Sequence, residues 1–270
     1  MKATVVVDNI KCDGIPGEWG LCIFIEYGEK KILLDTGASA LFADNADRLH
    51  ISLSDIDIAV LSHAHYDHAN GMRKFFEEND KAKFYLQNGC AESCYAKKWI
   101  FSKYIGIPRG IITDYGDRIE YVSGNYSICE GVGLVSHTTP GLDAIGKREG
   151  MYQKHGGRWY PDDFSHEQSL VIETARGLVV FNSCSHGGFM NIIHEVTAAY
   201  PDKKVLAYIG GLHIFKKTGS EIRELAREIK SIGIKYIGTG HCTGKRAYEI
   251  LKEELGDTVH QFNTGFVMEF

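Results

Sequence analysis

Proline is scarce in this chain, with only five among 270 residues, and no serine-rich, glycine-rich or charged block divides the sequence. Linkers between domains are commonly built from such blocks. Their scarcity therefore favours one large α/β domain over two small ones. Because 44% of the residues are hydrophobic, a chain of this length can bury a substantial core. We expect a single domain over residues 1–270.

Long apolar runs are also missing. No stretch approaches the roughly 20 apolar residues that a membrane helix needs, and Asp8 ends the short run Val5–Val7 before it could serve as a signal peptide. The seven cysteines are an odd number and too sparse for a disulfide framework, so we expect a cytoplasmic protein with reduced thiols. The net charge of −5 argues against nucleic acid as a partner, and no membrane partner is expected.

Histidine and aspartate are concentrated in one stretch, Leu61–Gly71, which reads Leu-Ser-His-Ala-His-Tyr-Asp-His-Ala-Asn-Gly. It follows an apolar run, Ile58–Leu61, that predicts a buried strand. Side chains at the carboxyl end of such a strand commonly form the sites of α/β proteins. Three imidazoles and one carboxylate suit a divalent ion such as zinc, iron or manganese. A metal site is therefore predicted in preference to a solvated histidine cluster, with the candidate ligands His63, His65, Asp67 and His68.

Three more histidines each lie just past a predicted apolar strand, and a site with two ions needs more ligands than the first motif supplies. We choose His186 and His241 as these ligands. One ion would then be held by His63, His65 and His186, and the other by Asp67, His68 and His241. Asp67 is also expected to orient the nucleophilic water. His213 follows two glycines, which allow a ligand to approach the backbone, so we assign it to the substrate; metal binding in place of His186 is the alternative.

The pattern H-x-H-x-D-H over residues 63–68 is the signature of the metallo-β-lactamase superfamily, which this chain resembles. Four further segments are similar to the branch named for 7,8-dihydropterin-6-methyl-4-(β-D-ribofuranosyl)aminobenzene-5′-phosphate synthase: Glu167–Val171, Cys184–Gly188, Gly210–His213 and Gly240–Gly244. The resemblance implies that Asp35 orients metal ligands without binding the ion. Better-known members carry a bridging aspartate where Ser183 and Cys184 stand here. Cys184 therefore either supplies a thiolate or only packs in the core.

The remaining pattern predicts strands and helices in the order of an αββα sandwich, with two mixed sheets flanked by helices. Residues 137–165 show no clear period, hold several glycines and interleave cations with aromatic side chains. A structureless segment of this length is often a lid, although a solvated loop is the alternative. The expected elements are strands at 3–7, 21–26, 31–34, 58–61, 83–86, 205–209, 235–238 and 265–268, a meander at 119–136, a hairpin at 169–181, and helices at 38–49, 72–78, 221–232 (capped by Ser220) and 245–255.

These features predict a hydrolase with two divalent ions, zinc before iron or manganese, which acts through activated water on a small phosphorylated or ester substrate. An anionic group of that substrate is expected at the start of the final helix, at Thr243, Gly244 and Lys245, because helix N-termini attract anions. Thr243 as an ordinary N-cap is the alternative. Competing functions are a phosphate-handling synthase or transferase in pterin-type cofactor synthesis, a flavodiiron-like oxidoreductase and a metal-free binding module. The oxidoreductase is disfavoured because flavodiiron-like proteins place a glutamate where His65 stands and carry a flavin domain.

Overall fold

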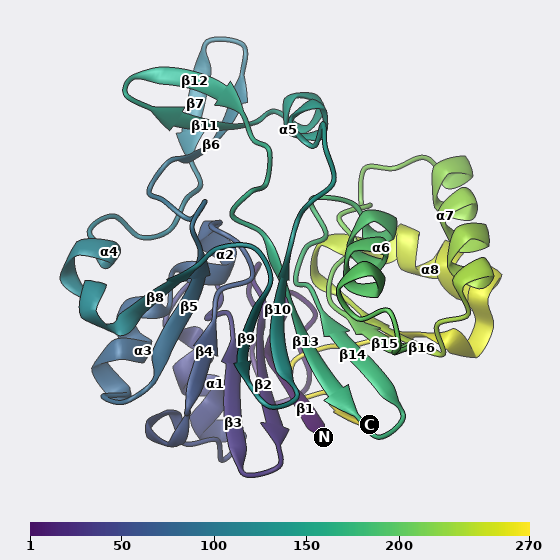
Figure 1. Ribbon diagram of the computed structural model, residues 1–270, viewed down its shortest axis with the longest axis horizontal. Coiled ribbons are helices and arrows are strands. Elements are labelled where there is room, and N and C mark those ends of the chain that lie inside the picture. Colours follow the sequence, from purple (N-terminus) through teal and green to yellow (C-terminus); the bar gives the residue numbers. More distant parts are fainter.

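Two seven-stranded sheets face each other in the computed structural model, which describes all residues 1–270 (Figure 1). The first sheet has the order β18-β1-β2-β3-β4-β5-β8. Neighbours from β18 to β3 are antiparallel, whereas β3, β4, β5 and β8 run parallel. Its strands are β1 Lys2–Val7, β2 Cys22–Tyr27, β3 Lys30–Leu34, β4 Ile58–Val60, β5 Lys83–Gln87, β8 Ile119–Val122 and β18 Val267–Glu269.

The second sheet repeats this plan, with parallel strands at one side and antiparallel strands at the other. Its order is β17-β16-β15-β14-β13-β10-β9. The parallel set runs from β14 to β17, and the antiparallel set from β14 to β9. The strands are β9 Tyr126–Cys129, β10 Val132–Ser136, β13 Gln168–Thr174, β14 Gly177–Phe181, β15 Val205–Ile209, β16 Tyr236–Thr239 and β17 Val259–Gln261.

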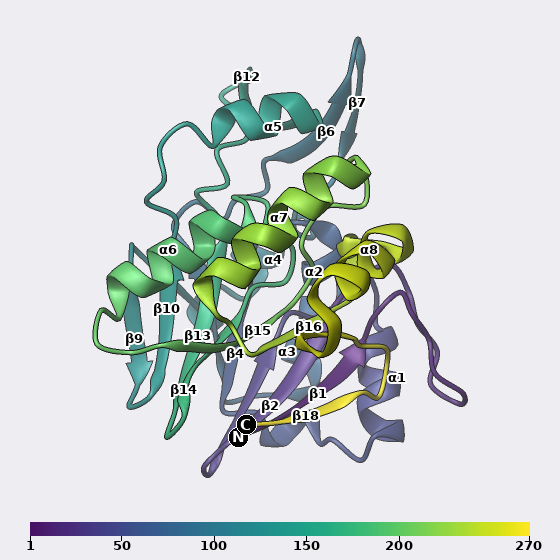
Figure 2. The ribbon, with the colours of Figure 1, turned by 90° about the vertical axis from the view of Figure 1, so that its right-hand side faces the viewer.

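Helices cover the outer face of each sheet, and an apolar core fills the space between the sheets. Side chains from both sheets, such as Ile23 and Phe181, meet in the central core. Phe42 and Phe75 pack under the helices of the first sheet, and Ile193 and Ile222 under those of the second. The predicted αββα sandwich is thereby confirmed. The helices are α1 Leu41–Arg48, α2 Tyr66–Ala69, α3 Met72–Glu78 and α4 Ile111–Asp114, then α6 Phe189–Ala199, α7 Gly219–Ile232 and α8 Lys245–Leu255 (Figure 2).

Residues 137–165 are not structureless, which corrects the sequence prediction. They form helix α5 (Asp143–Glu149) and the hairpin β11 (Met151–His155) and β12 (Arg158–Pro161). This hairpin joins β6 (Cys94–Lys98) and β7 (Phe101–Tyr104) in a separate sheet of order β12-β11-β6-β7, which stands above the sandwich in Figure 1. Its polar, half-exposed strands bury too few apolar side chains to leave a two-residue hydrophobic period in the sequence.

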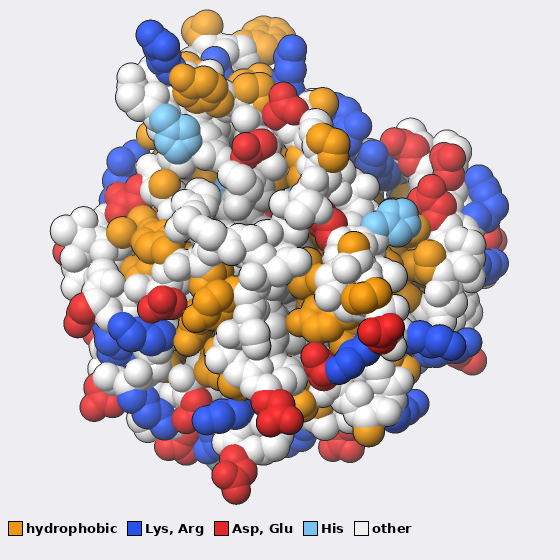
Figure 3. All heavy atoms as spheres, in the orientation of Figure 1, with side chains coloured by type: hydrophobic (Ala, Val, Ile, Leu, Met, Phe, Trp, Pro, Cys, Tyr) orange, Lys and Arg blue, Asp and Glu red, His pale blue; other side chains and the backbone are white.

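The turn between β6 and β7 carries the most exposed apolar side chains of the chain. Trp99 and Ile100 are each 88% exposed and Phe101 is 74% exposed. Orange side chains and cations gather over the four-stranded sheet at the top of Figure 3. None of the helices is both long and apolar enough to cross a membrane.

Two further sequence predictions are wrong in detail. The predicted meander does not form, because β8 pairs in parallel with β5 in the first sheet while β9 and β10 belong to the second. Alternating apolar residues identify a strand but not its partner. Helix α7 is capped by Thr218 and not by Ser220: the Thr218 hydroxyl accepts the Glu221 N–H, and the Glu221 carboxylate accepts the Thr218 N–H. This reciprocal capping box begins the helix earlier than predicted.

Candidate metal centre

The first motif leaves strand β4 and turns directly into the short helix α2. All three residues of β4 are buried, and His65 stands immediately before the helix in extended conformation. This sharp turn brings the four predicted ligands of the motif under the same edge of the sandwich. His63 and His68 are fully buried, His65 is 4% exposed and Asp67 is 8% exposed. A surface histidine cluster is therefore excluded.

His63, His65 and His186 converge on one point. Nδ1 of His65 lies 3.1 Å from Nε2 of His186, and the His63 ring centroid lies 4.7 Å from that of His65 and 4.8 Å from that of His186. Burial, reinforced by the crowded imidazoles, holds the pKa of His63 and of His186 well below the usual value and lowers that of His65 to about 4. The rings are therefore neutral and keep lone pairs for a ligand.

Asp67 joins His68 to His241 beside this group. Its Oδ2 atom lies 3.8 Å from Nε2 of His68 and 3.6 Å from Nε2 of His241. Burial alone would raise the pKa of Asp67, but the neighbouring imidazoles hold it well below its usual value. Burial would likewise lower the pKa of His241, yet the Asp67 carboxylate raises it to about 9. The second predicted trio is thus assembled around one carboxylate oxygen.

Asp35 orients His68 from behind. Its Oδ2 accepts hydrogen bonds from His68 Nδ1 at 2.8 Å, from the Ser62 hydroxyl at 2.7 Å and from the Ser183 hydroxyl at 2.6 Å. With its proton on Nδ1, His68 keeps a lone pair on Nε2, the ring nitrogen that lies on the side of Asp67. Asp35 is fully buried and has a positive φ of 61°. Residues other than glycine adopt this backbone conformation only at a cost in free energy. Asp35 therefore contacts a predicted ligand, and its role in orienting that ligand toward an ion stays a prediction.

The sulfur of Cys184 lies beside the same predicted ligand, His68. This sulfur lies 3.3 Å from Nε2 of His68 and 3.4 Å from the sulfur of Cys242. Cys184, His63 and His68 therefore form a group whose ligand atoms lie within 4.8 Å of one another, and Cys184, His241 and Cys242 form a second. Sequence reasoning missed Cys242. Its position directly after His241 was the available signal.

Two acidic residues, also missed, hold the loops that carry His186 and His241. Glu167 accepts the backbone N–H groups of His186 and Gly187, each at 2.9 Å. Asp8 accepts the N–H of His241 at 2.8 Å, and burial raises the pKa of Asp8 to about 6. Each carboxylate fixes the backbone of a predicted ligand from a different part of the chain. The motif Glu167–Val171 pointed to this position without revealing its role.

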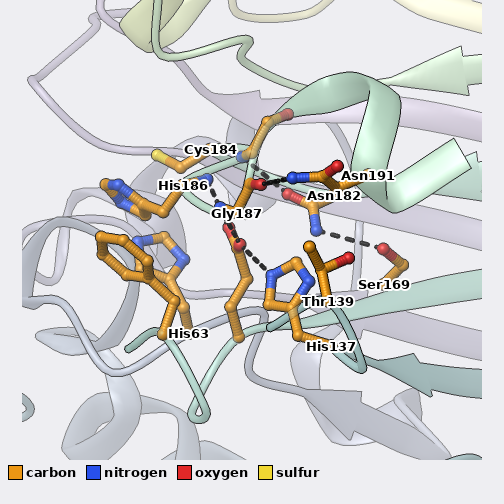
Figure 4. A network of polar contacts seen from close by, with 12 residues as sticks. His63, His137, Thr139, Ser169, Asn182, Cys184, His186, Gly187 and Asn191 are labelled. Carbon is orange, nitrogen blue, oxygen red and sulfur yellow. Dashed lines mark hydrogen bonds and ion pairs between the residues drawn. The ribbon is translucent and has the colours of Figure 1, made fainter. Parts of the chain in front are cut away.

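His137 ties Glu167 to a second glutamate, Glu195. Figure 4 shows His137 beside the loop that carries His186 and Gly187. Nε2 of His137 donates to Glu167 and Nδ1 donates to Glu195 at 2.8 Å. Glu195 in turn accepts the N–H groups of Thr138 and Thr139. Burial would lower the pKa of His137, but the two carboxylates raise it to about 9. A buried imidazolium between two carboxylates therefore supports the loop of His186.

His213 stands next to His186, with ring centroids 4.3 Å apart. Neither of its ring nitrogens has a hydrogen-bond partner, and its φ is +50°. His166, a weaker candidate, is fully engaged instead: Nδ1 accepts the Ala64 N–H at 3.1 Å, and Nε2 donates to Asp162 at 3.1 Å. His166 therefore braces the first motif, whereas His213 stays free for a ligand.

The three residues chosen for the substrate anion do not form a shared surface. The Thr243 hydroxyl is buried between the Leu212 N–H, which it accepts at 3.0 Å, and the Thr239 hydroxyl at 2.5 Å. The expectation that Thr243 offers its hydroxyl to a ligand is therefore wrong. The Lys245 side chain is 88% exposed and lies 3.9 Å from Glu249. Gly244 faces Phe215, whose Cβ would lie 2.8 Å from an added methyl group.

Ring nitrogens without partners test whether the site suits a metal ion. Nε2 of His63, Nε2 of His65 and both ring nitrogens of His241 are buried without a hydrogen-bond partner. A buried polar atom left unpaired costs about 1–3 kcal/mol. Imidazole and thiolate are ligands that zinc and iron accept readily. The donor set therefore fits divalent metal.

Comparison with known proteins agrees with this donor set. The sequence model described as "Metallo-beta-lactamase superfamily" matches residues 19–149. The chain is 27% identical, over 98% of both chains, to the 7,8-dihydropterin-6-methyl-4-(beta-D-ribofuranosyl)-aminobenzene-5′-phosphate synthase of Methanocaldococcus jannaschii. It is 28% identical to an uncharacterized protein of the same organism, over 92% of this chain and 93% of that relative.

A solved structure covers the whole fold. Tm1679, described as a metal-dependent hydrolase of the beta-lactamase superfamily, superposes with a TM-score of 0.86 at 25% identity, over 100% of this chain and 99% of that one. Fold, motif and full-length similarity agree. The chain therefore has the metallo-β-lactamase fold and resembles that superfamily, in particular its dihydropterin-ribofuranosylaminobenzene-phosphate synthase branch.

Proposed function

We propose that this protein is a hydrolase with two divalent metal ions that acts on a small phosphorylated or ester substrate. One observation supports it above the others: buried histidine and cysteine side chains from separate segments form groups whose ligand atoms lie within 4.8 Å of one another, and several of the ring nitrogens have no hydrogen-bond partner. His63, His65 and His186 would hold one ion. Asp67, His68 and His241 would hold the other, with Cys184 between them.

Divalent ions held there supply Lewis acidity, which lowers the pKa of water and polarises an electrophilic oxygen. Asp67 has a second oxygen with which to orient the attacking water, because only Oδ2 faces His68 and His241. His213 can donate a hydrogen bond to the substrate through the ring nitrogen that carries its proton, because both ring nitrogens are free of other partners. Burial of the ligand histidines keeps competing protons and bulk water away from the reacting atoms.

A synthase or transferase is the second candidate, and the full-length similarity to a synthase supports it. That relative's name describes a product that contains a dihydropterin and a ribofuranosylaminobenzene phosphate. The two candidates share the metal site and differ in the acceptor of the transferred group. Water is the acceptor for a hydrolase, and an organic amine or carbon nucleophile for a synthase.

The experiment combines metal analysis with an isotope test. Protein purified without chelator should contain about two divalent ions per chain, and His63→Ala with His241→Ala should remove most of them. Turnover of phosphate monoesters and carboxylic esters is then screened in ¹⁸O-labelled water. Label in the product supports hydrolysis. A product formed only when a second organic substrate is added supports the synthase. Metal-free wild-type protein would overturn both.

A further inference from the structure

Helix α6 begins beside the metal centre with nothing to cap it. Its N-cap is Gly188 at φ +95°, and its first turn holds no acidic side chain. The Gly188 N–H donates to the Ser185 carbonyl, and the next partnered N–H along the helix is that of Ile192. The three N–H groups between them, at residues 189–191, have no acceptor in the fold. An anion is the ligand that such a helix start favours.

A second, independent observation lies in the same cavity. The exposed fraction of His186 is only 5%, and its Nδ1 atom has no hydrogen-bond partner. His186 and His213 both line the cavity, together with the first residues of α6. Nε2 of His186 faces His65 and the predicted ion. An imidazole that binds metal through one nitrogen keeps its proton on the other, so Nδ1 of His186 becomes a hydrogen-bond donor without an acceptor.

The cavity has a volume of about 370 Å³, enough for a small organic molecule. Its apolar wall includes Phe189 and Leu212. The cations at its edge are already paired, Arg148 with Glu149 at 3.5 Å and Lys217 with Glu221 at 3.2 Å. Further carboxylates come from α7, which makes the α7 side unsuitable for an anion. The start of α6 is the part of this cavity that favours negative charge.

We propose that the N-terminus of α6, with His186 and His213, binds an anionic oxygen group of the substrate, a phosphate or a carboxylate. This inference rests on the proposed function, which it deepens by placing the anion next to the metal centre. It also moves the anion from helix α8, where Thr243 is engaged in the core, to helix α6. The apolar body of the substrate then lies against Phe189 and Leu212.

The test adds a negative charge to the first turn of α6 in metal-loaded protein. Asn191→Asp changes the shape little, and an acidic residue in the first turn favours the helix itself. We expect the Kd for phenylphosphonate, measured by calorimetry, to rise about tenfold or more, which corresponds to about 1.4 kcal/mol or more. Ala198→Glu adds the same charge to an exposed position of α6 outside the cavity and should change this Kd less than about twofold.

A second variant and two further ligands test the same site independently. Met190→Glu places the charge in the same turn while keeping the hydrogen bond from Asn191 Nδ2 to the Gly187 carbonyl, and it should weaken binding in the same way. Benzoate and benzyl alcohol replace phenylphosphonate to separate carboxylate, phosphate and neutral ligands. Equal binding in wild type, Asn191→Asp and Met190→Glu, or equal weakening by Ala198→Glu, would overturn the α6 site.

Metal content is measured on the same samples. If wild-type protein binds no divalent ion, the proposed function fails, whereas the ratio of phenylphosphonate Kd values between wild type and Asn191→Asp still judges the α6 site. If metal binds normally and this ratio is one, the α6 site fails and the proposed function stands.

Discussion

Glu167 should determine how firmly the loop of His186 is held, although it touches no predicted ion. Its carboxylate accepts three hydrogen bonds, from the N–H groups of His186 and Gly187 and from His137. Replacement by glutamine keeps one acceptor oxygen but turns an NH₂ group toward a donor. Burial would raise the pKa of Glu167, yet these partners hold it below its usual value, so the side chain accepts as a carboxylate.

The magnitude follows from the contacts. Hydrogen bonds to charged groups contribute about 1.5–3 kcal/mol each, and an unpaired buried donor adds its own cost. With one or two of the three bonds lost, Glu167→Gln should lower the free energy of unfolding by about 2–4 kcal/mol. The same change also loosens the backbone of His186. Residues that support a metal ligand in this way typically change metal affinity about 10- to 100-fold, and we expect a loss in that range.

Glu173→Gln is the matched control, because Glu173 lies on β13, the strand that begins directly after Glu167, and forms a surface ion pair with Lys203. Exposed pairs of this kind contribute less than about 1 kcal/mol, and metal affinity should not change. Urea unfolding of the metal-free proteins and calorimetric metal titration measure the two effects separately. Unchanged unfolding and unchanged metal affinity in Glu167→Gln would refute the reasoning. A loss of stability without a loss of affinity would leave Glu167 as a structural residue only.

Three further predictions concern the same centre. The pKa of His137 is raised to about 9 from an ordinary 6.5, so its charged form stabilises the fold fully below pH 6.5 and loses this contribution as pH rises through 9. The difference in unfolding free energy between wild type and His137→Gln should therefore shrink over that range. A constant difference would contradict this prediction. Asp35→Asn should reduce metal affinity about 10- to 100-fold while Asp57→Asn, at the surface, leaves it unchanged. Cys184→Ser should lower metal affinity more than Cys22→Ser, a buried cysteine outside the centre; equal affinities would make Cys184 a packing residue.

The sequence alone was sufficient to predict the sandwich and most of the residues that converge at the candidate metal centre. Strands β4, β15 and β16 are short and apolar, and a histidine follows each of them within a few residues, which predicts that their carboxyl ends lie at one edge of the sandwich. The spacing in residues 63–68 limits which side chains can share an ion, because the segment is continuous. The supporting role of Asp35 was predicted only through the family resemblance.

Contacts between distant segments could not be read in the same way. Glu167 and His186 are separated by 19 residues, and Asp8 and His241 by 233, and no periodic pattern connects either pair. The four-stranded sheet above the site forms because β6 pairs with β11 across a long stretch of chain. Its strands are too polar to show the alternation that marks a buried strand.

The position of the anion illustrates the same limit. Both α6 and α8 begin after a glycine and a histidine-containing loop, but the sequence analysis placed the anion at the start of α8 alone. Packing separates them: the Thr243 hydroxyl at the start of α8 is used inside the core, while the start of α6 opens into the cavity beside His186 and His213. A motif determines which chemical groups are present. Only the tertiary structure decides which of them keep a free donor facing a ligand, because hydrogen bonds to distant residues use up the rest.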